Sequence, residues 1–133
     1  MSYLETPLRG AYVIDMQPIE DERGWFSRTF CMEEFRANGL CSKFVQHNSS
    51  FNLRGGTIRG LHYQIPPYEE IKVVRCIRGK IFDVIVDIRK DSATYLKWFA
   101  VELSEDIVRC CTCQKALPMG FKRFVTSRRF FIL

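Results

Sequence analysis

Short runs in which apolar and polar residues alternate recur along the chain and predict β-strands. The clearest runs lie at residues 11–16, 25–30, 44–51, 57–64, 71–77, 80–88 and 98–103. Turn-forming residues separate them, and the pair Arg78-Gly79 predicts a tight hairpin between the fifth and sixth runs. Many short strands with frequent turns favour a β-sandwich or a β-barrel.

One short helical turn interrupts this pattern. It is expected over 32–38, where Glu33 and Glu34 stand near its positive end and Gly39 follows it. The 133 residues are enough for one hydrophobic core, so we expect a single domain over 1–133. Without a long apolar run or a signal-like start, we expect a cytoplasmic protein that does not span a membrane. The six cysteines have no spacing typical of a disulfide framework.

The net charge of +5 comes entirely from the end of the chain. Residues 107–133 hold six basic residues and no acid, which leaves 14 basic against 15 acidic residues in the body. A basic tail is typical of nucleic-acid or membrane-surface binding. The body lacks the interleaved aromatic residues of a single-strand binder, so we rank nucleic-acid binding low and expect no nucleic-acid partner.

The stretch Thr57–Gln64 carries the chemistry that organises the chain. Strict alternation places His62 and Arg59 on opposite faces of a strand, so a bulge or twist near Gly60 is needed to bring them together. A titratable base beside a fixed cation suits a site that binds an anion and moves a proton.

This stretch and its neighbours resemble the dTDP-4-dehydrorhamnose 3,5-epimerase family. The matching segments follow the family order over residues 8–106: DERGWF at 21–26, FVQHN at 44–48, RGLHYQ at 59–64, KVVR at 72–75, RGKIFDV at 78–84, VDIR at 86–89, KW at 97–98 and VELS at 101–104. The resemblance implies an all-β, cupin-like jelly roll (a double-stranded β-helix) with its site in one mouth of the barrel. It also implies 3,5-epimerisation of a dTDP-4-keto-6-deoxyhexose by proton abstraction and return, in rhamnose-type deoxysugar synthesis.

The resemblance also implies roles for individual residues. His62 matches the general base and Lys72 matches the cation beside the developing enolate oxygen. The positions that match diphosphate-binding and sugar-binding residues are Arg23, Gln46, Asn48 and Arg59, and Phe26 matches a residue near the nucleotide. Arg28 replaces a family glutamate that contacts the base, which leaves the preferred nucleotide base open. Asp83 is a second-tier candidate that either orients a site residue or is satisfied structurally.

We expect neither a metal nor a cofactor, because the histidine pattern of metal-binding cupins is absent and Cys110, Cys111 and Cys113 lack paired zinc spacing. The expected partners are a nucleotide-diphosphate-linked 4-keto-6-deoxy sugar and a second copy of the chain, in a homodimer. Two alternatives stay open: a barrel that binds the sugar nucleotide without converting it, and a 3,4-ketoisomerase acting on the same substrate class.

The tail from residue 107 departs from the family pattern. Moving its reading frame back by one nucleotide lets 114–121 read P-K-G-F-A-H-G-F, which is a family motif, when wobble bases are chosen freely. We therefore expect a frameshifted and truncated tail, a jelly roll incomplete at its C-terminus, and poor turnover for lack of an acid on the far face of the substrate.

Overall fold

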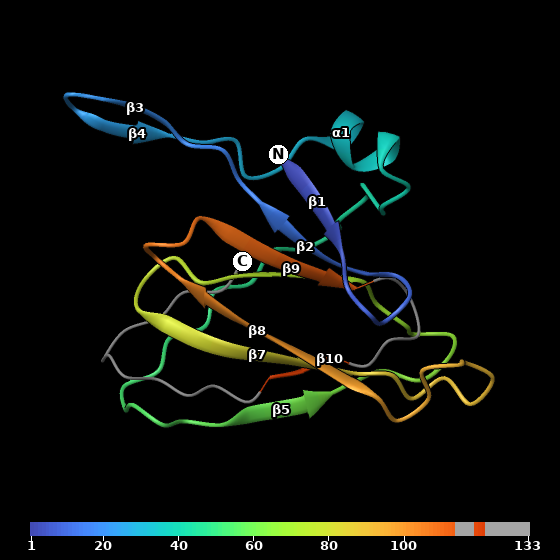
Figure 1. The fold of residues 1–133 in the computed structure, drawn as a ribbon. Coiled ribbons are helices and arrows are strands. Elements are labelled where there is room, and N and C mark those ends of the chain that lie inside the picture. The colour runs from blue at the N-terminus through green and yellow to red at the C-terminus, as the bar shows by residue number, and fades with distance from the viewer. Residues whose placement is uncertain (114–118, 122–133) are drawn as a thin grey trace.

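Two four-stranded antiparallel sheets form the body of the protein. The computed structural model describes residues 1–113 and the backbone of residues 119–121, so the rest of the reinterpreted tail lies outside the described residues. The first sheet has the order β1 (Ser2–Glu5), β2 (Ala11–Asp15), β9 (Arg109–Cys113), β6 (Lys72–Arg75). The second has the order β5 (Arg59–His62), β10 (Met119–Phe121), β7 (Lys80–Val86), β8 (Trp98–Ser104). They form the two layers of Figure 1, which is the expected jelly-roll arrangement.

Two smaller elements extend from this body. The short strands β3 (Ile19–Asp21) and β4 (Gly24–Phe26) pair with each other alone and form an arm that projects from the sheets (Figure 1). The helix α1 (Met32–Ala37) confirms the predicted helical turn, and Gly39 follows it with φ of 69°. In the part of the chain that the structure describes, no helix has the length and apolar character needed to cross a membrane.

The core between the sheets follows from strand alternation. In β7, Ile81, Asp83 and Ile85 point inward and are fully buried, while the residues between them are half-buried. Ile81 and Ile85 pack with residues from both layers: Leu8, Ala11, Val74, Cys76, Leu103, Cys111 and Cys113. Asp83 thus shares the face of Ile81 and Ile85, as the sequence predicted.

A second apolar cluster covers the other face of the first sheet. Phe35 of α1 is 1% exposed and packs with Ile14, Met16, Leu40 and Cys110. Both faces of the first sheet are therefore buried, which explains why β9 shows no polar alternation: four of its five residues are buried. The sequence interpretation missed β9 because it set aside the chain from residue 107 as a frameshifted tail.

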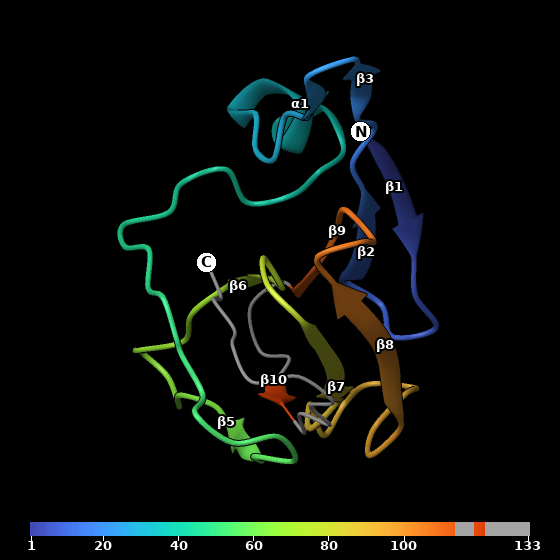
Figure 2. The same ribbon diagram turned by 90° about the vertical axis from the view of Figure 1, so that its left-hand side faces the viewer.

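Two predictions about strands are wrong. Residues 44–51 form no strand; the segment runs from α1 toward β5 along one side of the molecule (Figure 2). The turn at Arg78-Gly79 is not a hairpin, because β6 pairs with β9 and β7 pairs with β8 and β10. Gly79, with φ of 76°, instead turns the chain from one sheet to the other.

The predicted irregularity near Gly60 is confirmed. Met119 of β10 pairs with His62 and Phe121 pairs with Arg59. Paired positions are thus three residues apart in β5 but only two residues apart in β10. The additional residue is a bulge, and Gly60 in it has φ of 99°, a conformation that favours glycine. Positions 119 and 121 are two residues apart along β10, and positions two apart fall on the same face of a strand. Their partners in β5, His62 and Arg59, are therefore brought to one face by the bulge.

A buried carboxylate fixes the loop between β7 and β8. Asp87 is 0% exposed and accepts hydrogen bonds from Arg89 Nε (2.9 Å) and Nη2 (2.8 Å). The hydroxyls of Ser92 and Thr94 each donate to it at 2.6 Å. Arg89 Nη2 also donates to the carbonyl of Arg9 at 3.0 Å, which ties this loop to the turn between β1 and β2.

The Asp87 network predicts a loss of stability in acid. These hydrogen bonds, led by that of Arg89, hold the pKa of Asp87 well below its ordinary value. A carboxyl group with a depressed folded-state pKa contributes stability above its unfolded-state pKa of about 4 and loses that contribution as the pH falls further. We expect Asp87→Asn to lower the free energy of unfolding at neutral pH by about 3 kcal/mol, measured by urea denaturation.

The matched control is Asp91→Asn, an exposed acid of the same loop, which should change stability little. The difference in stability between Asp87→Asn and the unchanged protein should shrink below about pH 4. A difference that stays constant down to the acid transition would contradict this assignment.

Candidate functional site

A pocket of about 440 Å³ lies beside the edge strand β6. Its walls are β6 itself, the segment 44–48 and an aromatic group next to α1. Three residues predicted for the site line this pocket: Gln46, Asn48 and Lys72. Gln64, the last residue of the RGLHYQ motif, lines it as well.

Lys72 supplies a partly buried cation to the pocket. It begins β6 opposite Cys113 of β9, and its backbone carbonyl accepts a hydrogen bond from Thr112 Oγ1 at 3.0 Å. Its side chain is 23% exposed and its ammonium forms an ion pair with Glu70. Burial lowers the pKa of Lys72 below its ordinary value. A cation with few water contacts interacts strongly with nearby negative charge, as enolate stabilisation requires.

Aromatic side chains form the opposite end of the pocket. Phe30, Phe35 and Phe44 contact one another edge to face, with centroids 4.9 Å apart for Phe30 and Phe35 and 5.5 Å apart for Phe30 and Phe44. Phe30 and Phe44 are the partly exposed members of this group and Phe35 is buried. The pocket therefore offers an apolar wall at one end and amide and charged groups at the other, which suits a ligand with both characters.

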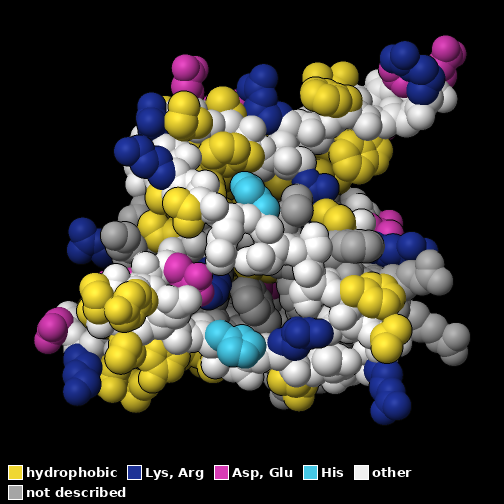
Figure 3. Space-filling view, turned by 180° about the vertical axis from the view of Figure 1, so that it is seen from behind, with side chains coloured by type: hydrophobic (Ala, Val, Ile, Leu, Met, Phe, Trp, Pro, Cys, Tyr) yellow, Lys and Arg dark blue, Asp and Glu magenta, His cyan; other side chains and the backbone are white. Residues whose placement is uncertain are grey.

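His62 and Arg59 lie on β5, in the other sheet, and are not among the pocket-lining residues. Gln64 stands two residues after His62 and lines the pocket, so the chain leaving β5 leads toward it. Figure 3 shows both histidine side chains of the protein on one face, on either side of a hollow. Arg59 Nε donates to Asn52 Oδ1 at 2.6 Å, and Asn52 is 3% exposed, so a buried group fixes the guanidinium.

Arg23 and Phe26 lie on the projecting arm and do not line the pocket. Arg23 is 84% exposed in its side chain and pairs with Asp21 of the same arm at 2.5 Å. Phe26 is 73% exposed. The structure therefore separates these two predicted site residues from Gln46, Asn48 and Lys72 within one copy of the chain.

Arg28, which replaces the family glutamate, is joined to α1. Its Nη1 lies 2.8 Å from Glu34 Oε1, and Glu34 also approaches the N-terminal amine of Met1 at 3.5 Å. The side chain of Arg28 is 63% exposed. The guanidinium is therefore directed toward α1, at the base of the arm.

Three charged or titratable residues of the pocket were missed by the sequence interpretation: His47, Glu70 and Arg75. Arg75 is half-buried, burial lowers its pKa, and it forms no ion pair with the residues that the structure describes. Glu70 and Arg75 lie two and three residues from the predicted Lys72. This closeness in sequence could have indicated that they belong to the same site. His47 stands between the two predicted residues Gln46 and Asn48, inside the FVQHN motif, but was given no role of its own.

Within residues 1–113 and the backbone of 119–121, no group of three or more histidine, cysteine, aspartate or glutamate residues could hold a metal ion. None of the six cysteines forms a disulfide. Burial raises the pKa of Cys110 to about 12 and of Cys113 to about 12, so both thiols stay protonated and unreactive at neutral pH.

Comparisons with known proteins agree with this arrangement. The family model described as dTDP-4-dehydrorhamnose 3,5-epimerase matches residues 5–127, which extends past residue 106. The epimerase of Methanothermobacter thermautotrophicus is 47% identical over 119 residues, which are 90% of this chain and 61% of that protein. The epimerase of Shigella flexneri is 41% identical over 122 residues, 91% of this chain and 65% of that protein. The chain thus spans less than two thirds of the length of these two relatives.

Solved structures give the same result. The dTDP-4-dehydrorhamnose 3,5-epimerase of Bacillus anthracis, with TDP and PPi bound, is 34% identical with a TM-score of 0.92 over 98% of this chain and 74% of that one. The Legionella pneumophila enzyme, in complex with dTDP-4-keto-L-rhamnose, is 32% identical with a TM-score of 0.88 over 98% of this chain and 68% of that one. The sheets, the motifs and the match over residues 5–127 together show that this chain belongs to the dTDP-4-dehydrorhamnose 3,5-epimerase family.

Proposed function

We propose that this chain carries the sugar-nucleotide site of a 3,5-epimerase that acts on a dTDP-4-keto-6-deoxyhexose, a step of rhamnose-type deoxysugar synthesis. The observation that carries the proposal is the pocket beside β6, which is lined by Lys72 and by the amide residues Gln46, Asn48 and Gln64. A pocket with an apolar wall, neutral hydrogen-bonding groups and a partly buried cation suits a keto sugar attached to a nucleotide.

The chemistry requires a base and a stabiliser of negative charge. His62 removes the proton from a carbon next to the keto group; the electron pair of that C–H bond forms the C=C bond of the enolate, and the π pair of the carbonyl moves onto the keto oxygen. Lys72 stabilises the resulting enolate, and the return of a proton to the opposite face of the carbon inverts it. Because the enolate carries a full negative charge, we assign the partly buried ammonium of Lys72 to the keto oxygen.

The arginines supply the anion-binding part of the site. Arg59 is positioned by its hydrogen bond to the buried Asn52, so less side-chain freedom is lost when it binds a phosphate oxygen. The bulge at Gly60 places Arg59 on the face that carries His62. Gln46 and Asn48 are neutral donors for the sugar hydroxyls or the phosphate.

Proton abstraction can be measured without relying on inversion. We expect the chain, given dTDP-4-keto-6-deoxyglucose in deuterium oxide, to incorporate deuterium at C3 or C5, followed by NMR or mass spectrometry. His62→Ala should slow the incorporation by about 10²–10⁴-fold, which is the usual contribution of a positioned acid–base group. Lys72→Ala should slow it as well, because the enolate then lacks its counter-charge.

The control is Tyr95→Ala, which changes an exposed side chain of the loop between β7 and β8 that does not line the pocket and should leave deuterium incorporation unchanged. Binding of the keto sugar nucleotide without any incorporation would favour the alternative of a non-catalytic binding module. Incorporation that survives His62→Ala unchanged would remove His62 from the role of base.

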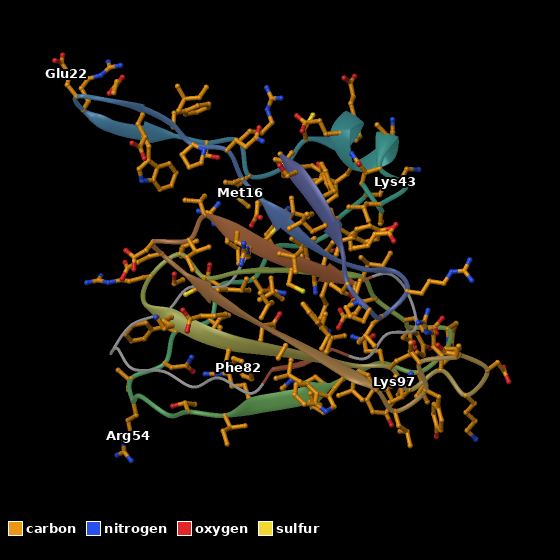
Figure 4. The ribbon with its side chains drawn as sticks, viewed as in Figure 1. Met16, Glu22, Lys43, Arg54, Phe82 and Lys97 are labelled. Carbon is orange, nitrogen blue, oxygen red and sulfur yellow. The ribbon has the colours of Figure 1, made fainter. Side chains whose placement is uncertain are left out.

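We further propose that two copies of the chain form a dimer through the β3–β4 arm. The arm exposes three large apolar side chains: Ile19 and Phe26 are each 73% exposed and Trp25 is 51% exposed. Its tip at Glu22 lies far from Met16, which lines the pocket (Figure 4). Exposed apolar side chains on a projecting element are typical of an interface. If the arm docks on a second copy of the chain, Arg23 and Phe26 can contribute to the ligand site of that copy.

The arm can be tested by light scattering. We expect a dimer that dissociates at a higher protein concentration when Trp25 and Phe26 are both replaced by serine, because their apolar area no longer leaves water on association. Leu53→Ser is the control, since Leu53 is 79% exposed in the loop before β5 and away from the arm. A monomer at all concentrations in the unchanged chain would rule out the dimer.

A further inference from the structure

Glu70 is the acidic side chain among the described residues that line the pocket. It lies in the loop before β6, two residues from Lys72, and its carboxylate forms an ion pair with the Lys72 ammonium. Both side chains are partly shielded from water, with exposures of 33% for Glu70 and 23% for Lys72. An ion pair in such a position is screened less than one on an open surface.

Among the residues that the structure describes around Lys72, no other group provides a competing negative charge. Cys113 of β9 is paired with Lys72 in the sheet, but burial keeps its thiol protonated. Asp83 of β7 is fully buried in the core and does not line the pocket. His47 from the segment 44–48 and Arg75 of β6 line the pocket and carry either no charge or positive charge.

We propose that Glu70 is a positioning residue that fixes the Lys72 ammonium in the pocket and sets the positive charge available to an anionic ligand. The role of Lys72 in enolate stabilisation belongs to the proposed function above, and the placement of Lys72 by Glu70 deepens it. Burial favours the neutral amine. A carboxylate in contact with the ammonium, as Glu70 is here, favours the charged form instead. Glu70 thereby keeps a charged lysine in a partly dry site.

The pairing has a second consequence for binding. With Glu70 ionised, the described charged residues of the pocket are two cations and one anion, which leaves one positive charge for a diphosphate. Replacing Glu70 by glutamine keeps the shape of the side chain and removes its charge. The variant should therefore bind thymidine diphosphate more tightly at neutral pH, while its Lys72 loses the proton at a lower pH than in the unchanged chain.

The protonation of Lys72 can be read directly and without any ligand. Trace acetylation followed by mass spectrometry of the Lys72 peptide gives the labelling rate as a function of pH, and only the neutral amine reacts. We expect Glu70→Gln to move the midpoint of the Lys72 labelling curve to lower pH by roughly 1 pH unit. Glu70→Asp, which keeps the carboxylate, should restore much of the difference.

Glu69→Gln is the matched control, because it removes the same charge from the neighbouring position, and its labelling curve should coincide with that of the unchanged chain. A Lys72 midpoint that is the same in Glu70→Gln and the unchanged chain would overturn the proposal. An equal displacement in Glu69→Gln would overturn it too, since it would reveal a general effect of net charge. Failure of the unchanged chain to bind thymidine diphosphate would count against the proposed function alone, because the labelling result does not depend on binding.

Discussion

The insertion of β9 between β2 and β6 is the constraint on which the rest of the structure depends. The strand joins the N-terminal part of the sheet to the edge strand that carries Lys72. Its cysteines face both clusters, since Cys110 packs beneath α1 while Cys111 and Cys113 pack between the sheets. A polar side chain on this strand needs a partner, as Thr112 Oγ1 has in the Lys72 carbonyl, and the small apolar thiols of the three cysteines need none.

The site inherits its geometry from this pairing. Lys72 is opposite Cys113 and Arg75 is opposite Cys110, so the two cations stand at the ends of one four-residue strand. Because β6 is the last strand of its sheet in the part of the chain that the structure describes, its outer side faces the segment 44–48, and the pocket lies there. A lysine at the beginning of an edge strand, packed on the core through its stem, can keep its ammonium in a partly shielded pocket.

The sequence predicted the parts of the fold that depend on local pattern. Strict alternation in β7 and the apolar run of β2 were sufficient to place both strands, and the glycine of the bulge followed from the need to align Arg59 with His62. Pairing partners were less predictable, because the turn chemistry of Arg78-Gly79 is the same for a hairpin and for a connection between sheets. The strand β9 was missed because the chain from residue 107 was interpreted as a frameshifted tail, and burial on both faces leaves no alternation there to argue for a strand.

The candidate site was predicted only in part for a related reason. Motif resemblance identified Lys72, Gln46 and Asn48, which share the pocket, whereas Glu70 became visible only through its contact with Lys72. Two residues two positions apart are neighbours on one face of a regular strand, but this rule does not apply in a loop. Glu70 lies in the loop before β6, so the sequence alone does not predict its contact with Lys72. Arg23 and Phe26 depend on the direction of the arm, which no local pattern determines.

The most direct test of this account is to map thymidine diphosphate binding by amide chemical shifts in NMR. The account predicts that the largest changes on titration fall on residues that line the pocket, namely Gln46, Asn48, Gln64 and Lys72, with little change in the Asp87 loop. Saturating ligand that leaves these four amides unchanged, or that perturbs only residues away from β6, would contradict the placement of the site in this pocket.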